Sequence, residues 1–366
     1  MAKKPHIYDK VVFLLQGGGA LGAYQVGACE ALLEYGCTPD WLVGTSIGAI
    51  NAAIIAGNTP ENRIKKLKLF WGTIASPIPE GTSIEENDAL HVLQKGFSSL
   101  WTIAFGQEGF FKPRLVNPWL NMSGYPDQIS FYDTSELKST LEELIDFNLI
   151  NQKKVRLTLA ALCLENGELV YFDNEKQEIR ADHVMASGAL PPGFPAIKID
   201  GKNYWDGGLS SNTPLNAILE EDFKNKLLCI MMHLFSYHQS VPTNMLEVLK
   251  LKKDIEYSSR YHEVLKHLCE IKHLHNLLHQ LAKEDPNLRN EKNMIEILKN
   301  SNPVSINIVR FHYRNIPGNL WSKDFEFSPQ TLIGHSKSGY HDVNQALKNP
   351  DWLLNHAFHS VKLREF

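Results

Sequence analysis

The sequence predicts an α/β fold built on a mainly parallel sheet. Val11–Leu15 is a short apolar, β-branched run that ends at glycines, which is typical of a buried strand. Trp41–Val43 is a second such run. Each run is followed by a glycine turn and an apolar segment with helical spacing, Gly22–Tyr35 and Ile47–Ala56. The chain therefore opens as strand–turn–helix–strand–turn–helix, the rhythm of parallel strands covered by helices.

The middle of the chain adds helices and an antiparallel hairpin. Pro60–Trp71 has helical spacing, and Thr134–Leu149 starts with a capping sequence, Thr-Ser-Glu-Leu, that predicts a helix. Val155–Leu164 and Glu168–Phe172 are strand-like and meet at Asn166-Gly167, a pair that favours a tight hairpin turn.

A second hairpin and a further strand complete the predicted core. Ala196–Ile199 and Asn203–Trp205 flank Asp200-Gly201, and Leu227–Phe235 is another apolar strand. We therefore expect a core over residues 10–235.

The composition changes after residue 235. Met245–Lys283 predicts a long amphipathic helix, and the alternation in Ile306–His312 predicts a strand that returns to the main sheet. Ser328–Phe366 contains another helix and a charged tail. Residues 236–366 are thus expected to form a mainly helical extension with one strand in the core sheet.

Composition narrows the class of protein. The 366 residues are 43% hydrophobic and 21% charged, as in globular domains. A net charge of −4 argues against a nucleic-acid partner. The five cysteines are odd in number and form no CxxC pair, which indicates free thiols in a reducing compartment. Because no run is long enough for a secretory signal or a membrane span, we expect a cytoplasmic protein.

The sequence Gly44-Thr45-Ser46-Ile47-Gly48 lies between a predicted strand and a predicted helix. A G-x-S-x-G sequence in this context forms a nucleophile elbow, which presents the serine hydroxyl at the carboxyl edge of the sheet near a helix N-terminus. The alternative is that Ser46 only caps the helix. We predict that Ser46 is a nucleophile.

The first glycine turn, Gly17-Gly18-Gly19 followed by Gly22, also joins a strand to a helix. Its spacing satisfies the dinucleotide-binding pattern G-x-G-x-x-G, but Asp40 precedes the second strand instead of ending it, as that pattern requires. Three successive glycines can instead aim bare backbone N–H groups at one point. We therefore predict an oxyanion hole formed by Gly17, Gly18 and Gly19.

A third motif is Asp206-Gly207-Gly208, an acid and two glycines at the end of a predicted strand. Alone it indicates no more than a turn. Ser46 and Asp206 lie 160 positions apart, so only the fold can bring them together.

These motifs, in this order, resemble the patatin-like phospholipase family, as does ASGALPPGFP at Ala186–Pro195. The resemblance covers about residues 10–235, and the whole chain is similar to a bacterial subgroup with a C-terminal extension. It implies a three-layer α/β/α fold, a modified α/β-hydrolase. It also implies a Ser46–Asp206 dyad, oxyanion donors at Gly18 and Gly19, and hydrolysis of lipid acyl esters of the phospholipase A or lysophospholipase type without a metal ion or other cofactor. Because a solvated aspartate is too weak a base, such a dyad requires Asp206 to be partly buried and within hydrogen-bond reach of Ser46.

One position departs from the family. The glycine loop of the family often carries Lys or Arg where this chain has Leu21, so a role for that charge in attracting a lipid head group is not expected here.

Because the chain has fifteen histidines, a catalytic triad of Ser, Asp and His is an alternative to the dyad. His183 precedes the DGG motif, and His233 follows it in the order Ser, Asp, His of α/β-hydrolases. His275 and His279 have the i, i+4 spacing of metal ligands, but without HExxH or a cysteine pair a solvated helix face is the better interpretation.

Met245–Lys283 alternates Leu with Lys and His and is a candidate for a lid or for a helix in peripheral membrane contact. Leu90–Phe111 is a second candidate for a lid, because its aromatic residues are suited to an acyl pocket. For Met245–Lys283, packing on the sheet is the favoured alternative.

Three functions remain in competition: a lipid acyl hydrolase, an esterase for another acyl ester or polymer, and a non-catalytic nucleotide-binding or interaction protein. Oligomeric state, a homo-oligomer included, stays open.

Overall fold

The computed structural model describes residues 8–76, 89–116, 118–120, 124–219, 226–235, 241–300, 306–314, 322–354 and 361–366. Within these residues, a nine-stranded sheet has the order β11-β10-β9-β1-β2-β5-β8-β7, and β6 pairs with β5. The strands are β1 (Lys10–Leu15), β2 (Trp41–Thr45), β5 (Arg156–Cys163), β6 (Leu169–Asp173), β7 (Ile197–Ile199), β8 (Lys202–Asp206), β9 (Leu227–His233), β10 (Ile306–His312) and β11 (Val361–Glu365). A separate small ladder joins β3 (Lys112–Pro113) to β4 (Tyr132–Asp133).

The sheet is mainly parallel, as predicted. Every pairing from β11 through β10, β9, β1 and β2 to β5 is parallel. The two hairpins expected from the turn sequences are present: β5 pairs antiparallel with β6, and β7 pairs antiparallel with β8. The second hairpin continues the sheet, because β8 also pairs antiparallel with β5.

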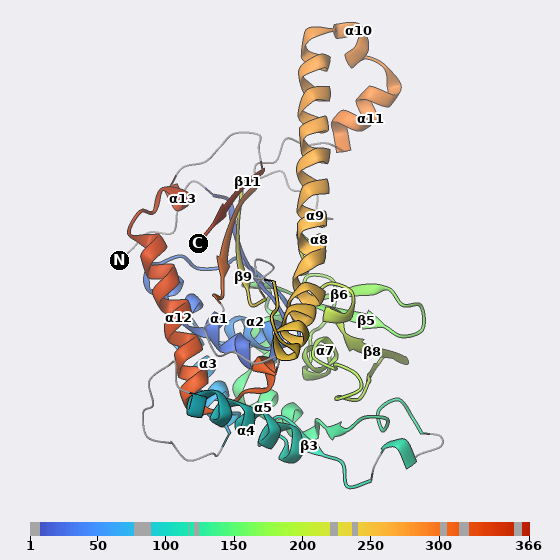
Figure 1. Ribbon diagram of the computed structural model, residues 1–366. Coiled ribbons are helices and arrows are strands. Elements are labelled where there is room, and N and C mark those ends of the chain that lie inside the picture. The colour runs from blue at the N-terminus through green and yellow to red at the C-terminus, as the bar shows by residue number, and fades with distance from the viewer. Residues whose placement is uncertain are drawn as a thin grey trace.

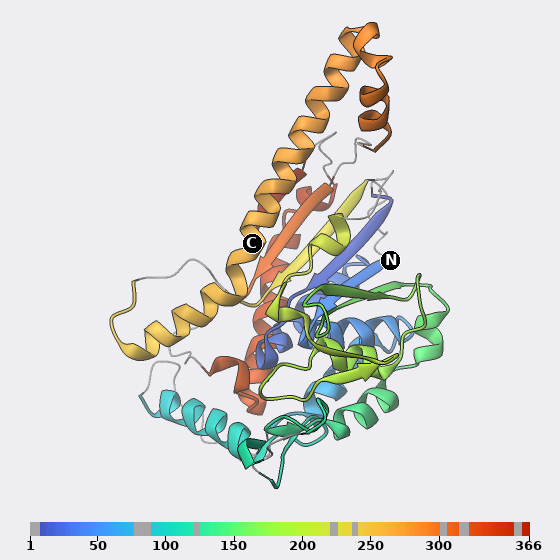
Figure 2. The same cartoon turned by 90° about the vertical axis from the view of Figure 1, so that its right-hand side faces the viewer.

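Helices cover both faces of the sheet. The α-helices are α1 (Ala23–Glu34), α2 (Ile47–Ala56), α3 (Arg63–Thr73), α4 (Ala89–Phe105), α5 (Ser135–Leu144), α6 (Phe147–Asn151), α7 (Ala181–Ser187), α8 (Asn216–Leu219), α9 (Met245–Glu284), α10 (Pro286–Arg289), α11 (Lys292–Asn300), α12 (Pro329–Leu347) and α13 (Asp351–Leu354). Short 3₁₀ turns are η1 (Gly19–Gly22), η2 (Pro118–Leu120), η3 (Gly207–Leu209) and η4 (Lys323–Phe325). Figures 1 and 2 show the sheet lying between α12 on one side and α9 on the other.

Alternate residues of β1 divide the core into two layers. Val11, Phe13 and Leu15 belong to the larger buried cluster, with side chains of α1, α2, α3 and α12. Val12 and Leu14 point into a second cluster, with side chains of α8 and α9. Because successive side chains of a strand point to opposite faces, this division confirms a three-layer α/β/α arrangement.

The region after residue 235 is part of this core. Gly27 of α1 and Gly339 of α12 allow the two helices to touch: a Cβ added at Gly27 would lie 1.8 Å from the Ser336 carbonyl oxygen, and one at Gly339 would lie 2.0 Å from that of Tyr24. The returning strand expected at Ile306–His312 is β10. A second strand, β11, pairs beside it, so the expectation of a single returning strand was incomplete.

The long helix α9 forms as predicted from its spacing, beginning at Met245 and ending at Glu284. Its middle packs on the sheet through Tyr261 and Leu265. Beyond these residues α9 extends away from the sheet, and α10 and α11 lie at its far end (Figure 1).

The helix expected over Thr134–Leu149 is interrupted. Thr134 makes no side-chain capping bond, and the backbone between α5 and α6 is extended at Ile145 and Asp146. The reason is a tertiary contact: the Asp146 N–H donates to the Gly57 carbonyl at 3.0 Å, and the Asp146 side chain then caps α6 by accepting from the Leu149 N–H.

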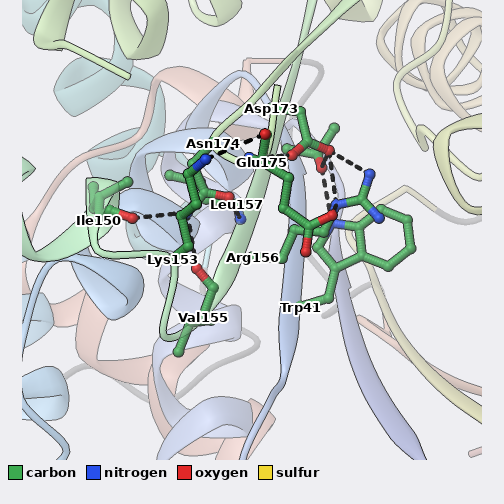
Figure 3. Close-up of polar contacts among 10 residues, drawn as sticks. Trp41, Ile150, Lys153, Val155, Arg156, Leu157, Asp173, Asn174 and Glu175 are labelled. Atoms are coloured by element: carbon green, nitrogen blue, oxygen red, sulfur yellow. Dashed lines mark hydrogen bonds and ion pairs between the residues drawn. The ribbon is translucent and has the colours of Figure 1, made fainter. Parts of the chain in front are cut away.

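A buried polar cluster joins β2, β5 and β6 (Figure 3). It lies at the start of β2, whereas Ser46 follows the end of this strand. Arg156 donates to Asp173 through Nε at 2.8 Å and Nη2 at 2.6 Å, and its guanidinium lies 4.1 Å from the centre of the Trp41 ring. Thr158 also donates to Asp173. Asn174 donates to two backbone carbonyls in the same region. Every charge in this cluster has a partner, which is what a structural role requires.

Candidate active site

Ser46 lies in the tight turn between β2 and α2. Its backbone has φ 56° and ψ −127°, a conformation that residues with a side chain rarely adopt. The turn is held because the Ser46 N–H donates to the hydroxyl and the carbonyl of Ser187, each at 3.1 Å. A Cβ added at Gly44 would lie 2.5 Å from the Gly48 carbonyl oxygen, and one at Gly48 would lie 2.2 Å from that of Leu15. Both motif glycines are therefore required by close backbone packing.

The sheet register brings Asp206 to Ser46. On β5, Ala160 is opposite Thr45, the last residue of β2, and the next residue, Ala161, is opposite Asp206, the last residue of β8. Over these positions β6 pairs with one edge of β5, so β2 and β8 both pair with the opposite edge. The last residues of β2 and β8 therefore face each other along that edge. Both side chains line the same pocket, and an interaction with the Ser46 side chain lowers the pKa of the Asp206 carboxyl group.

The environment of Asp206 changes its acidity. The residue is 2% exposed, and burial raises the pKa of its carboxyl group from 3.8 to about 7. Two interactions oppose the rise, one with the Ser46 side chain and one a hydrogen bond from the Gly208 N–H at 2.7 Å. A carboxylate with this pKa is a far better proton acceptor than a solvated aspartate.

The two glycines after Asp206 fit tightly against β5 and the carboxyl group. A Cβ on Gly207 would lie 2.6 Å from the Ala160 carbonyl oxygen, and one on Gly208 would lie 3.0 Å from Asp206 Oδ1. Gly207 and Gly208 therefore let the chain turn directly below the carboxylate. Gly22 is similarly enclosed, since a Cβ there would lie 2.7 Å from Ile47.

The glycine loop reaches the same place from β1. Gly18 and Gly19 line the pocket that contains Ser46 and Asp206. Gly17 does not line it: its N–H donates to the Asn212 carbonyl at 3.3 Å, and its carbonyl accepts from the Asn212 side chain at 3.1 Å. The expectation that Gly17 is an oxyanion donor is therefore corrected, because this N–H already has a partner.

Two polar residues that the sequence analysis missed hold the loop. Gln16 is fully buried; its side-chain oxygen accepts from the N–H of Leu234 at 2.6 Å, and its amide donates to Thr213 at 3.0 Å. Asn212 binds Gly17 as described. Gln16 directly precedes the glycines and Asn212 follows the DGG motif by four residues, so each stood beside a recognised motif. Which backbone groups they would bind was set by the fold.

The pocket over Ser46 is narrow and mostly apolar. It holds about 70 Å³ of free space. Its apolar lining includes Ile47, Ile50, Phe110, Phe111, Leu190, Phe194, Phe235, Phe325 and Phe327. Tyr257 of α9 and Asp324 of η4 also line it, so the region after residue 235 completes the pocket. An apolar lining around a few converging polar groups is typical of a site for an apolar ligand.

Neither histidine of the triad alternative borders this pocket. His183 accepts from the Arg180 N–H at 3.0 Å at the start of α7, and His233 packs edge-on against Tyr261 in the second core cluster. The proposed order Ser, Asp, His is thus not assembled around Ser46 by His183 or His233.

The described residues also limit two other kinds of site. Among them, no group of three or more His, Cys, Asp or Glu side chains is placed to hold a metal ion. The side chain of His275 lies outside the described part, so the pair with His279 is not placed. No helix in the described ranges combines the length and apolar character needed to cross a bilayer.

Comparison with known proteins places these features in a family. A family model described as patatin-like phospholipase matches residues 13–219, and a second, described as patatin phospholipase, matches residues 255–357. Together they include the three glycine motifs and most of the region after residue 255.

Similarity to individual curated proteins is confined to short stretches. A patatin-like phospholipase domain-containing protein of Pyricularia oryzae is 42% identical over 60 residues, which are 16% of this chain and 8% of that protein. A protein of the same description from Coccidioides immitis matches to the same extent. The triacylglycerol lipase SDP1L of Arabidopsis thaliana is 33% identical over 55 residues, 15% of this chain and 7% of the lipase. The matching stretch thus spans less than a tenth of each relative.

Two solved structures are similar at a low level. VipD from Legionella pneumophila has a TM-score of 0.37 and 15% identity, covering 93% of this chain and 67% of VipD. The type III effector ExoU of Pseudomonas aeruginosa has a TM-score of 0.34 and 12% identity, covering 96% of this chain and 55% of ExoU. The family assignment rests on the family model, which matches more than half of the sequence. The chain belongs to the patatin-like phospholipase family.

Proposed function

We propose that this protein hydrolyses acyl esters of phospholipids or lysophospholipids, with Ser46 as nucleophile and Asp206 as its base. The observation that carries the proposal is that Ser46 and the buried carboxyl group of Asp206 line the same apolar pocket, where Ser46 lowers the pKa of that carboxyl group. Family membership and the description of the Pyricularia oryzae relative agree with a lipid ester as substrate.

The first half of the reaction transfers the acyl group to Ser46. Asp206 takes the hydroxyl proton as Ser46 Oγ attacks the ester carbonyl carbon, and the carbonyl oxygen becomes negatively charged. The N–H groups of Gly18 and Gly19, which border the pocket, stabilise this oxygen. When the bond to the leaving alcohol breaks, Asp206 returns the proton to that alcohol, which leaves an acyl-serine.

Hydrolysis of the acyl-serine restores the enzyme. Asp206 accepts a proton from a water molecule, whose oxygen attacks the acyl carbon, and the same proton then returns to Ser46 as the fatty acid leaves. A single carboxyl group serves both halves because it lies next to Ser46.

The dinucleotide-binding alternative fits the loop less well. A Cβ on Gly19 would lie 2.3 Å from the Asp324 carbonyl oxygen, so η4 covers the loop at the place where a pyrophosphate would have to approach the glycines.

The proposal is tested with a fluorophosphonate probe and a panel of esters: phosphatidylglycerol, lysophosphatidylcholine and a triacylglycerol. We expect the probe to label the wild-type protein and Ser46→Ala to lose labelling. Hydrolysis of the preferred ester should fall by at least about 10³-fold. Ser139→Ala, at an exposed position on α5, is the matched serine control and should change neither result. Unchanged labelling or turnover in folded Ser46→Ala would refute the assignment.

A further inference from the structure

Where its side chains are described, from Gly96 to Phe105, helix α4 has its hydroxyl-bearing residues inside and large apolar residues outside. Ser98 and Ser99 are each 2% exposed and Thr102 is fully buried. Phe97, by contrast, is 58% exposed, and Leu100 is 62% exposed. A helix on the surface of a water-soluble domain normally has the opposite arrangement.

Polar contacts fix this orientation. The Ser99 hydroxyl donates to the Ser322 carbonyl just before η4, and the Thr102 hydroxyl donates to the Gln107 side chain, each at 3.4 Å. The Tyr132 hydroxyl donates to the Ile103 carbonyl at 2.7 Å. Turning the helix to bury its apolar face would separate the hydroxyl groups of its inner face from these partners, so the outward position of the apolar face belongs to the fold.

The outer face of α4 between Gly96 and Phe105 carries a row of aromatic rings and no charge. The ring centres of Phe97 and Trp101 lie 6.1 Å apart, and those of Trp101 and Phe105 lie 4.3 Å apart, so the rings form a row along the helix. Phe105 is 62% exposed. No residue from Gly96 to Gly106 has a charged side chain.

The segment after α4 enlarges this apolar surface. In Figures 1 and 2 it lies at the same end of the molecule as α4. Its exposed apolar residues are Leu115, Val116, Trp119, Tyr125 and Ile129. Exposed apolar surfaces of this extent mark sites that contact a protein or a membrane.

The pocket over Ser46 is connected to this surface through two neighbouring segments. Phe110 and Phe111, which line the pocket, follow α4 in the chain, and α4 packs on η4, which contributes Asp324 and Phe325 to the same pocket. Part of the pocket lining is therefore carried by segments that adjoin the exposed apolar face.

We propose that the outer face of α4 (Phe97, Leu100, Trp101 and Phe105), together with Leu115, Val116 and Trp119, docks on the surface of a lipid bilayer and brings the pocket to its substrate. This inference rests on the proposed function. A lipid surface fits better than a protein partner, because residues 96–106 offer exposed aromatic and aliphatic groups without charges and α4 packs on η4, which lines the pocket that would take an acyl chain.

Flotation with lipid vesicles tests the proposal in a Ser46→Ala background, in which hydrolysis cannot change the vesicles. The test variant is Phe97→Ser/Leu100→Ser/Phe105→Ser. The matched control is Ile271→Ser/Leu274→Ser/Leu277→Ser, which removes three apolar residues of similar exposure (50%, 57% and 41%) from the distal half of α9. Vesicles of phosphatidylcholine, with and without phosphatidylglycerol, distinguish apolar docking from attraction to anionic head groups.

We expect the parent and the α9 control to float with the vesicles. The α4 variant should lose at least about tenfold in partitioning, because three apolar contacts with the bilayer are lost. With Ser46 restored, the α4 variant should hydrolyse a soluble short-chain ester within about twofold of the wild type, since none of its substitutions lies among the pocket residues. An α4 variant that floats as well as the parent overturns the proposal.

Three further outcomes are informative. If the wild type cleaves the soluble ester but does not float, the docking surface is wrong while the proposed function stands. If no ester is cleaved but flotation depends on α4, the proposed function fails and the surface stands. If light scattering shows that the lipid-free parent is a dimer and the α4 variant a monomer, the face is an interface between copies of the chain, which also overturns the proposal.

Discussion

At the scale of single residues, Asp206 carries a conflict between stability and the proposed chemistry. A base has to be ionised, but its burial favours the neutral acid and raises its pKa to about 7. The Gly208 N–H donates to this carboxyl group, and an interaction with the Ser46 side chain also favours its ionised form. Such destabilised groups are characteristic of functional sites, where stability is exchanged for reactivity.

Asp206→Asn should therefore stabilise the fold while it abolishes turnover. The folded chain keeps this proton up to about pH 7, whereas the unfolded chain loses it near pH 3.8, so the folded state is progressively destabilised as pH rises between these values. We expect the free energy of unfolding of the variant to exceed that of the wild type by on the order of 3 kcal/mol at pH 8, and by much less at pH 4. Urea unfolding at both pH values measures this difference.

The same ionisation should govern activity. In the wild type, kcat/KM for a soluble ester should fall as pH drops below about 7, because the protonated carboxyl group cannot accept the Ser46 proton. Asp206→Asn should show no turnover across the range. If Asp206→Asn gained less unfolding free energy over the wild type at pH 8 than at pH 4, the assignment of this pKa would be contradicted.

At the scale of elements, α9 and η4 are joined by two crossed ion pairs beside the pocket. Lys323 pairs with Asp254 at 2.6 Å, and Lys253 pairs with Asp324 at 2.5 Å. Lys323 and Asp254 are both almost fully buried. Because the Asp324 carbonyl oxygen packs on Gly19, these pairs connect α9 to the glycine loop that borders Ser46.

Removing one partner of the buried pair should be more harmful than removing both. Lys323→Met leaves Asp254 buried without its cation and should cost about 3–5 kcal/mol of unfolding free energy. Lys323→Met/Asp254→Leu should recover most of that loss. Thermal unfolding of the two variants, with Lys266→Met as an exposed control on α9, gives the comparison. Equal destabilisation by the single and double variants would argue against this account.

At the scale of the whole molecule, the region after residue 235 is integral to the fold and to the pocket. β10 pairs with β9 along its whole length, α12 contacts the backbone of α1, and α9 covers the second core cluster. The predicted boundary near residue 235 thus separates two regions of different composition that share one sheet.

A chain ending at residue 235 should not fold on its own. Truncation would expose the apolar edge of β9 and the surface of α1 that α12 covers, and an unpaired apolar edge strand favours aggregation. We expect the truncated chain to be insoluble or to lack a cooperative unfolding transition, whereas the full chain is soluble and unfolds cooperatively. A monomeric truncated chain with cooperative unfolding would show that the first 235 residues are an independent domain.

Most elements could be predicted from local patterns because their stabilising contacts repeat with the period of the backbone. The strand at Val11–Leu15, the helix after Ser46 and the hairpin at Asn166-Gly167 follow from side-chain alternation and turn chemistry, and the structure has all three. The prediction of one continuous helix over Thr134–Leu149 was wrong, because the Asp146 N–H donates to the carbonyl of Gly57, a partner far away in the sequence. α4 was noted only for its aromatic residues, since its inverted polarity is visible only against its neighbours.

The sequence by itself determined the family, the succession of strands and helices, and the three glycine motifs, because each depends on residues close together in the chain. The tertiary structure alone decided what those motifs meet. The register on β5 brings Asp206 to Ser46 across 160 positions, and packing of η4 and α9 closes the pocket. The tertiary structure also decided that the Gly17 N–H donates to the Asn212 carbonyl, and that burial raises the pKa of Asp206. Desolvation and long-range pairing arise only when distant segments come together, so no local pattern records them.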